Sequence, residues 1–142
     1  MVVKTKKHKL EYKEKFDFLL IGLTSNENDY RLAWKLNNSL KYNFEKTENH
    51  QVRLSGGVEI EFPHFIFENQ ETMLFYRLLG NKNERGVLLE ELKNIDFLLT
   101  VQGEFDELFI SGFITNLKKI DTIHGVFRIS PASLKNRERL LF

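Results

Sequence analysis

Two stretches of the chain, FDFLLIG at residues 16–22 and IDFLLTV at residues 95–101, share the tetrapeptide Asp-Phe-Leu-Leu. Each is a short apolar run rich in β-favouring residues, which predicts strands over about 16–24 and 95–102. Each run is followed by a segment with the spacing of an amphipathic helix. We therefore predict two strand–helix–strand units of related construction. The alternative is that two amphipathic segments of a Leu- and Phe-rich chain align by chance.

The two predicted helices lie at residues 29–40 (DYRLAWKLNNSL) and 104–119 (EFDELFISGFITNLKK). The first follows SNEND, a run of residues that cap helices. The second has acids at its start and lysines at its end, which complement the helix dipole. A predicted strand follows each helix, at 42–46 and at 122–130. The apolar stripes match position by position: Leu32, Ala33, Leu36 and Leu40 with Phe109, Ile110, Phe113 and Leu117.

Between the two units, residues 58–79 predict an inserted β-hairpin, while ENHQVRLSGG (residues 48–57) predicts a loop. Pro63 cannot donate a ladder hydrogen bond, so it marks an edge strand or a bulge. The predicted fold is α+β: a ferredoxin-like sandwich of two βαβ units, with an antiparallel sheet, both helices on one face, and the inserted hairpin extending the sheet. The alternative, a small doubly wound α/β fold, needs more helices than the sequence predicts.

The composition predicts one globular domain at residues 16–142, since the chain has 142 residues, 42% of them apolar, including 13 phenylalanines. It has no apolar run of 18 residues and no secretion signal at its start, so we expect no membrane span. The absence of cysteine excludes disulfides and thiolate metal sites, and a cytoplasmic location is the expectation.

Residues 1–15 predict a basic, flexible N-terminal tail, because they hold six lysines and two glutamates in a chain of net charge +1. Such a tail can bind RNA or another acidic partner by neutralising phosphates or carboxylates. The alternative is a solvated terminus without a partner.

The residues that carry catalytic or ligand chemistry are scattered, so we predict no metal, no cofactor and no catalytic site. The four histidines show no metal-ligand spacing. His64 and His124 fall on predicted strands and can lie close together, but a hydrogen-bonded structural histidine is the simpler interpretation. Asp17 and Asp96 occupy matching places in the two units and can form a carboxylate pair, or can each face water or a lysine at a strand start.

Aromatic side chains on the predicted hairpin suggest a second possible binding chemistry. On a sheet face beside a basic tail, such rings can stack RNA bases. Phenylalanine is also a common core residue, and no RNA-binding signature accompanies the set. The residues are Phe62, Phe65, Phe67, Phe75 and Tyr76.

Strand alternation assigns a face to each residue of the two Asp-Phe-Leu-Leu strands. We expect Phe16, Phe18 and Leu20, with Ile95, Phe97, Leu99 and Val101, to meet the helices. The opposite face mixes acids with large aliphatic residues, which predicts an apolar patch that binds a protein partner or a second copy. The inserted hairpin or the C-terminal segment can cover this patch instead. The predicted interface residues are Leu19, Ile21, Leu23 and Leu98.

The segment LEELKNIDF (residues 89–97) resembles the motif that names the IPExxxVDY family of uncharacterised bacterial proteins. Leu89 takes the Ile position, Glu91 the Glu, Ile95 the Val, Asp96 the Asp and Phe97 the Tyr. Glu90 replaces the proline, so the motif departs from the family name. The stretches at 16–37 and 129–142 also resemble the family. The resemblance implies no catalytic residue, ligand or cofactor.

These features together predict a small non-enzymatic, protein-binding module that acts by self-association or through a protein partner. One alternative is an RNA-binding accessory protein that uses the basic tail. Another is a small-molecule-sensing domain, by analogy with ferredoxin-like folds that hold ligands between subunits.

Overall fold

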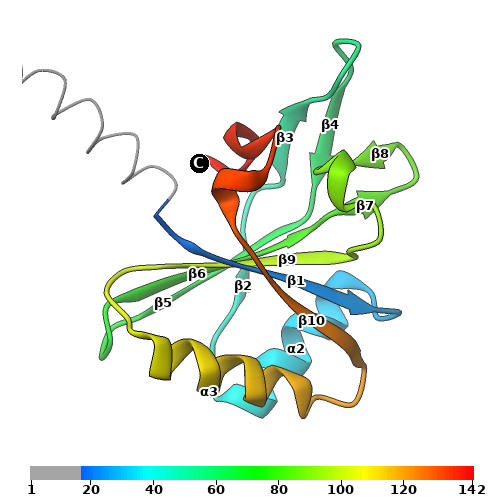
Figure 1. The fold of residues 1–142 in the computed structure, drawn as a ribbon. Coiled ribbons are helices and arrows are strands. Elements are labelled where there is room, and N and C mark those ends of the chain that lie inside the picture. Colours follow the sequence, from blue (N-terminus) through cyan, green and yellow to red (C-terminus); the bar gives the residue numbers. More distant parts are fainter. Residues whose placement is uncertain (1–16) are drawn as a thin grey trace, which may run out of the picture.

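A six-stranded antiparallel sheet forms the centre of the computed structural model, which describes residues 17–142 (Figure 1). The predicted tail at residues 1–15 lies outside the described residues, as does Phe16. The strand order is β10-β1-β9-β6-β5-β2. The strands are β1 (Leu19–Ser25), β2 (Glu45–Lys46), β5 (His64–Asn69), β6 (Leu74–Gly80), β9 (Phe97–Gln102) and β10 (Ile123–Ile129).

The two helices, α2 (Asp29–Leu40) and α3 (Glu107–Lys118), lie on the same face of this sheet (Figure 1). Each begins at a side-chain cap. The Asn28 Oδ1 atom accepts a hydrogen bond from the Arg31 amide at 2.8 Å, and the Asp106 Oδ1 atom accepts one from the Phe109 amide at 2.9 Å. The helices bury their apolar stripes against the sheet, and this defines the helix-side core.

Small elements cover the opposite face of the sheet (Figure 1). Apolar side chains from these elements and from the sheet form a second core, whose buried members include Leu20, Phe62, Leu88, Leu98 and Leu140. The covering elements are the hairpins β3 (His50–Arg53) with β4 (Glu59–Phe62) and β7 (Lys82–Asn83) with β8 (Gly86–Val87), and the 3₁₀ turns η1 (Glu90–Leu92), η2 (Pro131–Ser133) and η3 (Arg137–Leu140).

The α+β class with an antiparallel sheet and two helices is confirmed, but the predicted ferredoxin-like arrangement of two βαβ units is not. The sheet has six strands, and the β5–β6 hairpin lies inside it between β9 and β2 rather than at an edge. Pro63 divides the first strand of the predicted 58–79 hairpin, so that β4 pairs with β3 and β5 pairs with β6. The predicted loop at 48–57 contains β3, whose HQVR sequence has too few apolar residues to predict a strand.

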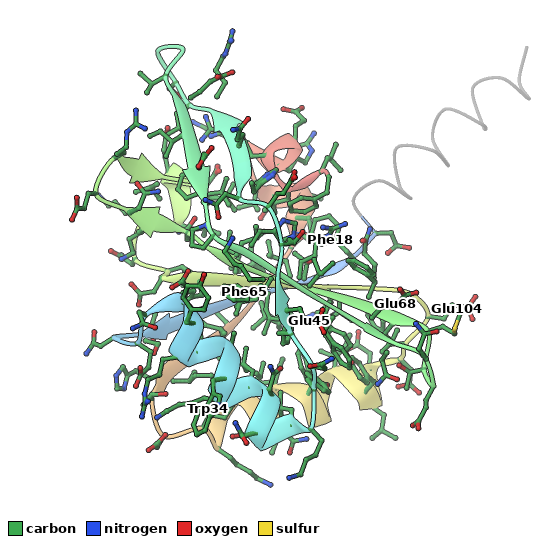
Figure 2. The ribbon with its side chains drawn as sticks, turned by 180° about the vertical axis from the view of Figure 1, so that it is seen from behind. Phe18, Trp34, Glu45, Phe65, Glu68 and Glu104 are labelled. Carbon is green, nitrogen blue, oxygen red and sulfur yellow. The ribbon has the colours of Figure 1, made fainter. Side chains whose placement is uncertain are left out.

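The apolar patch predicted for the two Asp-Phe-Leu-Leu strands is not an exposed surface. Leu19, Ile21 and Leu23 lie in the helix-side core, whereas Leu98 lies in the second core, and none is more than 5% exposed. Both faces of the sheet are covered, so both faces are apolar and alternation does not show which one meets the helices. Phe18, Leu20 and Ile95 were expected beneath the helices but belong to the second core, and Phe18 points to that side in Figure 2.

Candidate protein interaction surface

Strand β10 forms one edge of the sheet. It pairs with β1 on one side, and no strand among residues 17–142 pairs with its outer side. Proteins protect exposed edges with lysine, proline or very short strands. The opposite edge strand, β2, has only two residues. By contrast, β10 has seven residues, IHGVFRI, with no lysine and no proline. Its register with β1 shifts only between Thr24 and Ser25, so the regular stretch from Gly125 to Ile129 is the part of the edge best suited to receive another strand.

Contacts of Asp96 reveal which backbone groups of β10 face outward. The Ser25 amide donates to the Asp96 Oδ2 atom at 2.9 Å, and the Asp96 amide donates to the Leu23 carbonyl at 2.9 Å. The backbone groups of Leu23 and Ser25 therefore face β9. Leu23 pairs with Val126 on the other side, and backbone direction alternates along a strand. It follows that the N–H and C=O groups of Val126 and Arg128 face the open edge.

Phe127 lies beside this edge on the sheet face opposite the helices, and its side chain is 49% exposed. Its ring packs over Gly125, where a Cβ atom would lie 2.7 Å from the ring. Next to the ring is a mainly apolar hollow of about 390 Å³, lined by Thr24, Glu91, Leu92, Asn94, Ile95, Phe127 and Ile129.

Arg128, on the helix side of β10, is paired within the chain. Its guanidinium donates two hydrogen bonds to the Glu107 carboxylate, at 2.8 and 3.1 Å. These bonds lower the pKa of Glu107 and raise that of Arg128. The positive charge of the edge strand thus already has a partner.

The segment at residues 89–97 connects parts of the chain that are distant in sequence. Leu89 and Ile95 are buried in the second core, and Phe97 is buried in the helix-side core. The Glu91 carboxylate accepts hydrogen bonds from the backbone amides of Lys135, at 2.8 Å, and Asn136, at 3.4 Å. Asp96, besides its bonds to β1, lies 3.0 Å from the Lys82 Nζ atom. These contacts give the segment at residues 89–97 a structural role.

Asn81 is a buried polar residue that the sequence analysis did not single out. Its Nδ2 atom donates to the carbonyls of Leu92, at 2.9 Å, and Ile95, at 2.8 Å. Its Oδ1 atom accepts from the Leu89 amide at 3.0 Å. Asparagine is common in turns, and the surrounding GNKNERG reads as a tight connection, so no sequence signal distinguishes this role.

The structure pairs His64 with His50, not with His124, and their ring centroids are 6.2 Å apart. The Arg77 Nη1 atom lies 3.0 Å from the His64 Nε2 atom, and the Arg77 guanidinium lies over the Phe142 ring at 4.2 Å from its centroid. The His50 Nε2 atom lies 2.6 Å from the Arg139 carbonyl oxygen. This histidine cluster, comprising His50, His64 and Arg77, therefore holds the segment after η2 against the sheet.

Both histidines of the cluster have lowered pKa values. Burial, followed by the charge of Arg77, lowers the pKa of His64 to about 4. Burial is also the main cause of the lowered pKa of His50. Both rings are thus neutral at pH 7, which lets the His64 Nε2 atom accept from Arg77 and the His50 Nε2–H group donate to the Arg139 carbonyl.

We predict that this cluster makes the domain acid-sensitive. An unfolded histidine binds a proton near pH 6.5, whereas folded His64 binds one only near pH 4. The unfolded state therefore holds more protons in this window, and the free energy of unfolding should fall by about 2 kcal/mol between pH 7 and pH 5. Urea unfolding at pH 7 and pH 5 measures the fall. It should be smaller in His64→Gln and unchanged in His124→Gln, an exposed control; an equal fall in His64→Gln contradicts the prediction.

Neither the possible carboxylate pair nor the possible RNA-stacking face is formed. Asp17 and Asp96 lie at opposite ends of the β1–β9 pair. Asp17 precedes the end where Leu19 pairs with Val101, and Asp96 precedes the end where Leu23 pairs with Phe97, so the two carboxylates are apart.

The aromatic residues that were considered for stacking RNA bases do not form an exposed face. Phe62, Phe65 and Tyr76 are buried, and Phe67 packs against the helix-side core. Phe75 is half-buried, with the Arg77 guanidinium over its ring.

Two exposed aromatic residues on α2 form another surface, and Figure 2 shows Trp34 on the outer side of the helix. Trp34 is 58% exposed and Tyr30 is 63% exposed. The guanidinium of Arg31 lies 5.7 Å from the Trp34 ring centroid, and Tyr30 packs edge-on against Phe65. Neighbouring side chains thus already contact both rings.

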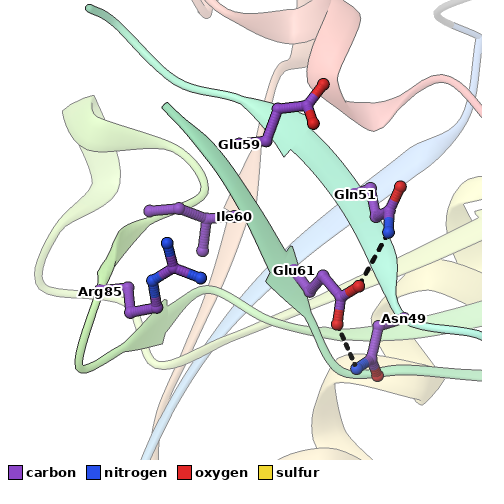
Figure 3. Close-up of a pocket in the computed structure, with 6 residues that line it drawn as sticks. All are labelled: Asn49, Gln51, Glu59, Ile60, Glu61 and Arg85. Atoms are coloured by element: carbon purple, nitrogen blue, oxygen red, sulfur yellow. Dashed lines mark hydrogen bonds between the residues drawn. The ribbon is translucent and has the colours of Figure 1, made fainter. Parts of the chain in front are cut away.

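A polar hollow of about 400 Å³ lies on the β3–β4 hairpin (Figure 3). The Glu61 carboxylate accepts hydrogen bonds from Gln51, at 2.8 Å, and from Asn49, at 3.3 Å, and these bonds lower the pKa of Glu61. Glu59, Ile60 and Arg85 also line the hollow. Its polar groups bond to one another across an exposed surface, and no activated nucleophile lies among these six residues.

Residues 17–142 contain no group of three or more His, Cys, Asp or Glu side chains placed to hold a metal ion. Neither helix in this range is both long enough and apolar enough to cross a membrane. Comparison with protein-family models finds no match. Comparison with curated proteins finds no significant match.

Proposed function

We propose that the chain is a non-catalytic protein-binding module and that its binding surface is the open edge of β10. The observation that carries the proposal is the seven-residue edge strand, with the backbone groups of Val126 and Arg128 facing outward beside the half-exposed Phe127. An extended segment added there gains main-chain hydrogen bonds, and a side-chain pocket beside it supplies selectivity. The hollow next to Phe127 provides such a pocket.

The proposal keeps the predicted cytoplasmic setting and the resemblance to the IPExxxVDY family. A ferredoxin-like origin for the sheet is also part of it, supported by the order β10-β1-β9, in which β9, α3 and β10 form a βαβ unit around β1. In this proposal, Glu91, Ile95 and Asp96, the residues compared with the IPExxxVDY motif, help to hold the binding surface in place. Ile95 and Glu91 line the hollow, and Asp96 holds the end of β1 against the start of β9.

We predict that Val126→Pro abolishes partner binding while the domain stays folded. Proline removes an N–H that faces the open edge and is tolerated on edge strands for this reason. Val126→Thr is the matched control, because it keeps the N–H and the β-branched shape. The assay is capture from native lysate, with and without nuclease treatment, on immobilised protein, with melting curves for each variant.

The expected result is a protein retained by the native chain and by Val126→Thr but reduced at least tenfold with Val126→Pro. Equal capture by the native chain, Val126→Thr and folded Val126→Pro would show that the β10 edge is not the binding surface. Capture that disappears on nuclease treatment alone would favour the RNA-binding alternative.

A further inference from the structure

We infer that the strand received at the β10 edge is β10 of a second copy of this chain, antiparallel about a two-fold axis at Phe127. The inference rests on the proposed function and names the partner for the same surface. The dimer would join the two sheets into one continuous sheet.

The regular part of the edge is symmetric about Phe127. Ser25 pairs with Ile123 and Thr24 pairs with Gly125, so His124 is an extra residue that forms a bulge. Regular pairing therefore begins at Gly125 and runs to the end of the strand at Ile129. Phe127 is the middle residue of this stretch.

A two-fold axis at Phe127 matches the outward backbone groups of two copies. It places Val126 of one copy opposite Arg128 of the other, and the same pair recurs on the other side of the axis. These are the two residues whose N–H and C=O groups face outward, so each pair exchanges both backbone hydrogen bonds. An axis at Val126 would instead pair Arg128 with the bulged His124 and lose part of the ladder.

The same axis brings together the apolar side chains of the exposed sheet face. Phe127 of each copy would face Phe127 of the other in a non-hydrogen-bonded pair, where side chains are closest. Gly125 would face Ile129, and the glycine leaves room for the aromatic rings. Each ring also lies beside the hollow lined by Leu92, Ile95 and Ile129, so pairing would bury its exposed half.

Charge does not oppose this pairing. Arg128 is the single charged residue between Gly125 and Ile129. Its guanidinium is bound by Glu107 of its own copy. In the proposed register it lies opposite Val126, so no like charges meet directly across the strands. A stretch with one neutralised cation gives no basis for selecting a strongly acidic or basic peptide, whereas its symmetric backbone pattern fits a second copy.

The first test is the mass of the purified full chain by sedimentation equilibrium over a range of concentrations. The native chain and Val126→Thr should approach twice the chain mass of 16.8 kDa. Val126→Pro should remain monomeric, and Phe127→Ala should weaken the dimer at least tenfold. A native chain that stays monomeric to about 1 mM overturns the inference.

The second test does not depend on a proline variant that folds. The chain has no cysteine, so Phe127→Cys introduces a single thiol at the axis. Non-hydrogen-bonded antiparallel partners are ~4.5 Å apart between Cα atoms, which lies within the range that a disulfide spans. Mild oxidation should link two copies of Phe127→Cys but not of Leu108→Cys, whose site on α3 is 82% exposed.

Because Phe127→Cys also lacks the ring, oxidation is carried out at a protein concentration at which Phe127→Ala is still dimeric. A native dimer without the disulfide in Phe127→Cys at that concentration would mean that copies associate elsewhere, and it overturns the inference. The proposed function fails separately, if folded Val126→Pro captures the same proteins from lysate as the native chain. A monomeric native chain with Val126-dependent capture would leave the function standing with a different partner.

Discussion

Replacing Leu98 by aspartate is expected to unfold the domain rather than to release a partner. Leu98 is fully buried in the second core, and its neighbours across β1 and β6 are Gly22 and Leu79. The variant loses the transfer free energy of a buried leucine, ~2–3 kcal/mol, and places a carboxylate where no cation is paired with it. We expect a total loss of more than ~5 kcal/mol, comparable to the whole stability of a small domain.

Leu108→Asp is the matched control, because the same replacement occurs at an 82% exposed position in the first turn of α3. An acid there interacts favourably with the helix dipole, so its stability should lie within ~0.5 kcal/mol of the native value. Circular dichroism and urea unfolding measure both variants. A folded Leu98→Asp with native stability would show that the small elements do not seal this face of the sheet.

Local signals predicted much of the fold. Apolar runs of strand length predicted β1 and β9, and the capping residues of SNEND predicted the start of α2. The second helix was predicted from residue 104, but α3 begins three residues later, after the Asp106 cap. The side of the sheet that each strand residue faces was not predictable in the same way. Polar residues normally mark the solvent face of a strand. Here the second layer removes water from that face, so Leu20 and Leu98 are as apolar as the residues under the helices.

The candidate surface depended on strand order, which the sequence encodes only through tertiary contacts. The segment at 122–130 was predicted as a strand, but its outer position follows from pairing with β1 alone. Asp96 was predicted as a polar residue before a strand. Its hydrogen bond to the Ser25 amide spans 71 positions and has no local signature. The same holds for the approach of His50 to His64.

Asn81→Ala is expected to lower the free energy of unfolding by about 3–5 kcal/mol. The side chain bonds three buried or part-buried backbone groups, of Leu89, Leu92 and Ile95, and each group left without a partner costs ~1–3 kcal/mol.

Asn81→Asp separates the effect of these hydrogen bonds from that of packing, because it keeps the side-chain volume. It replaces the donor with an oxygen that faces the carbonyls of Leu92 and Ile95, so it should destabilise at least as much as alanine. Asn94→Ala, at an exposed position in the same connection, is the control and should stay within ~0.5 kcal/mol of the native protein. Thermal unfolding should show a drop of ~10 °C or more for both Asn81 variants. A melting temperature within ~2 °C of the native value for Asn81→Ala would mean that the connection between β6 and β9 holds its shape without this side chain.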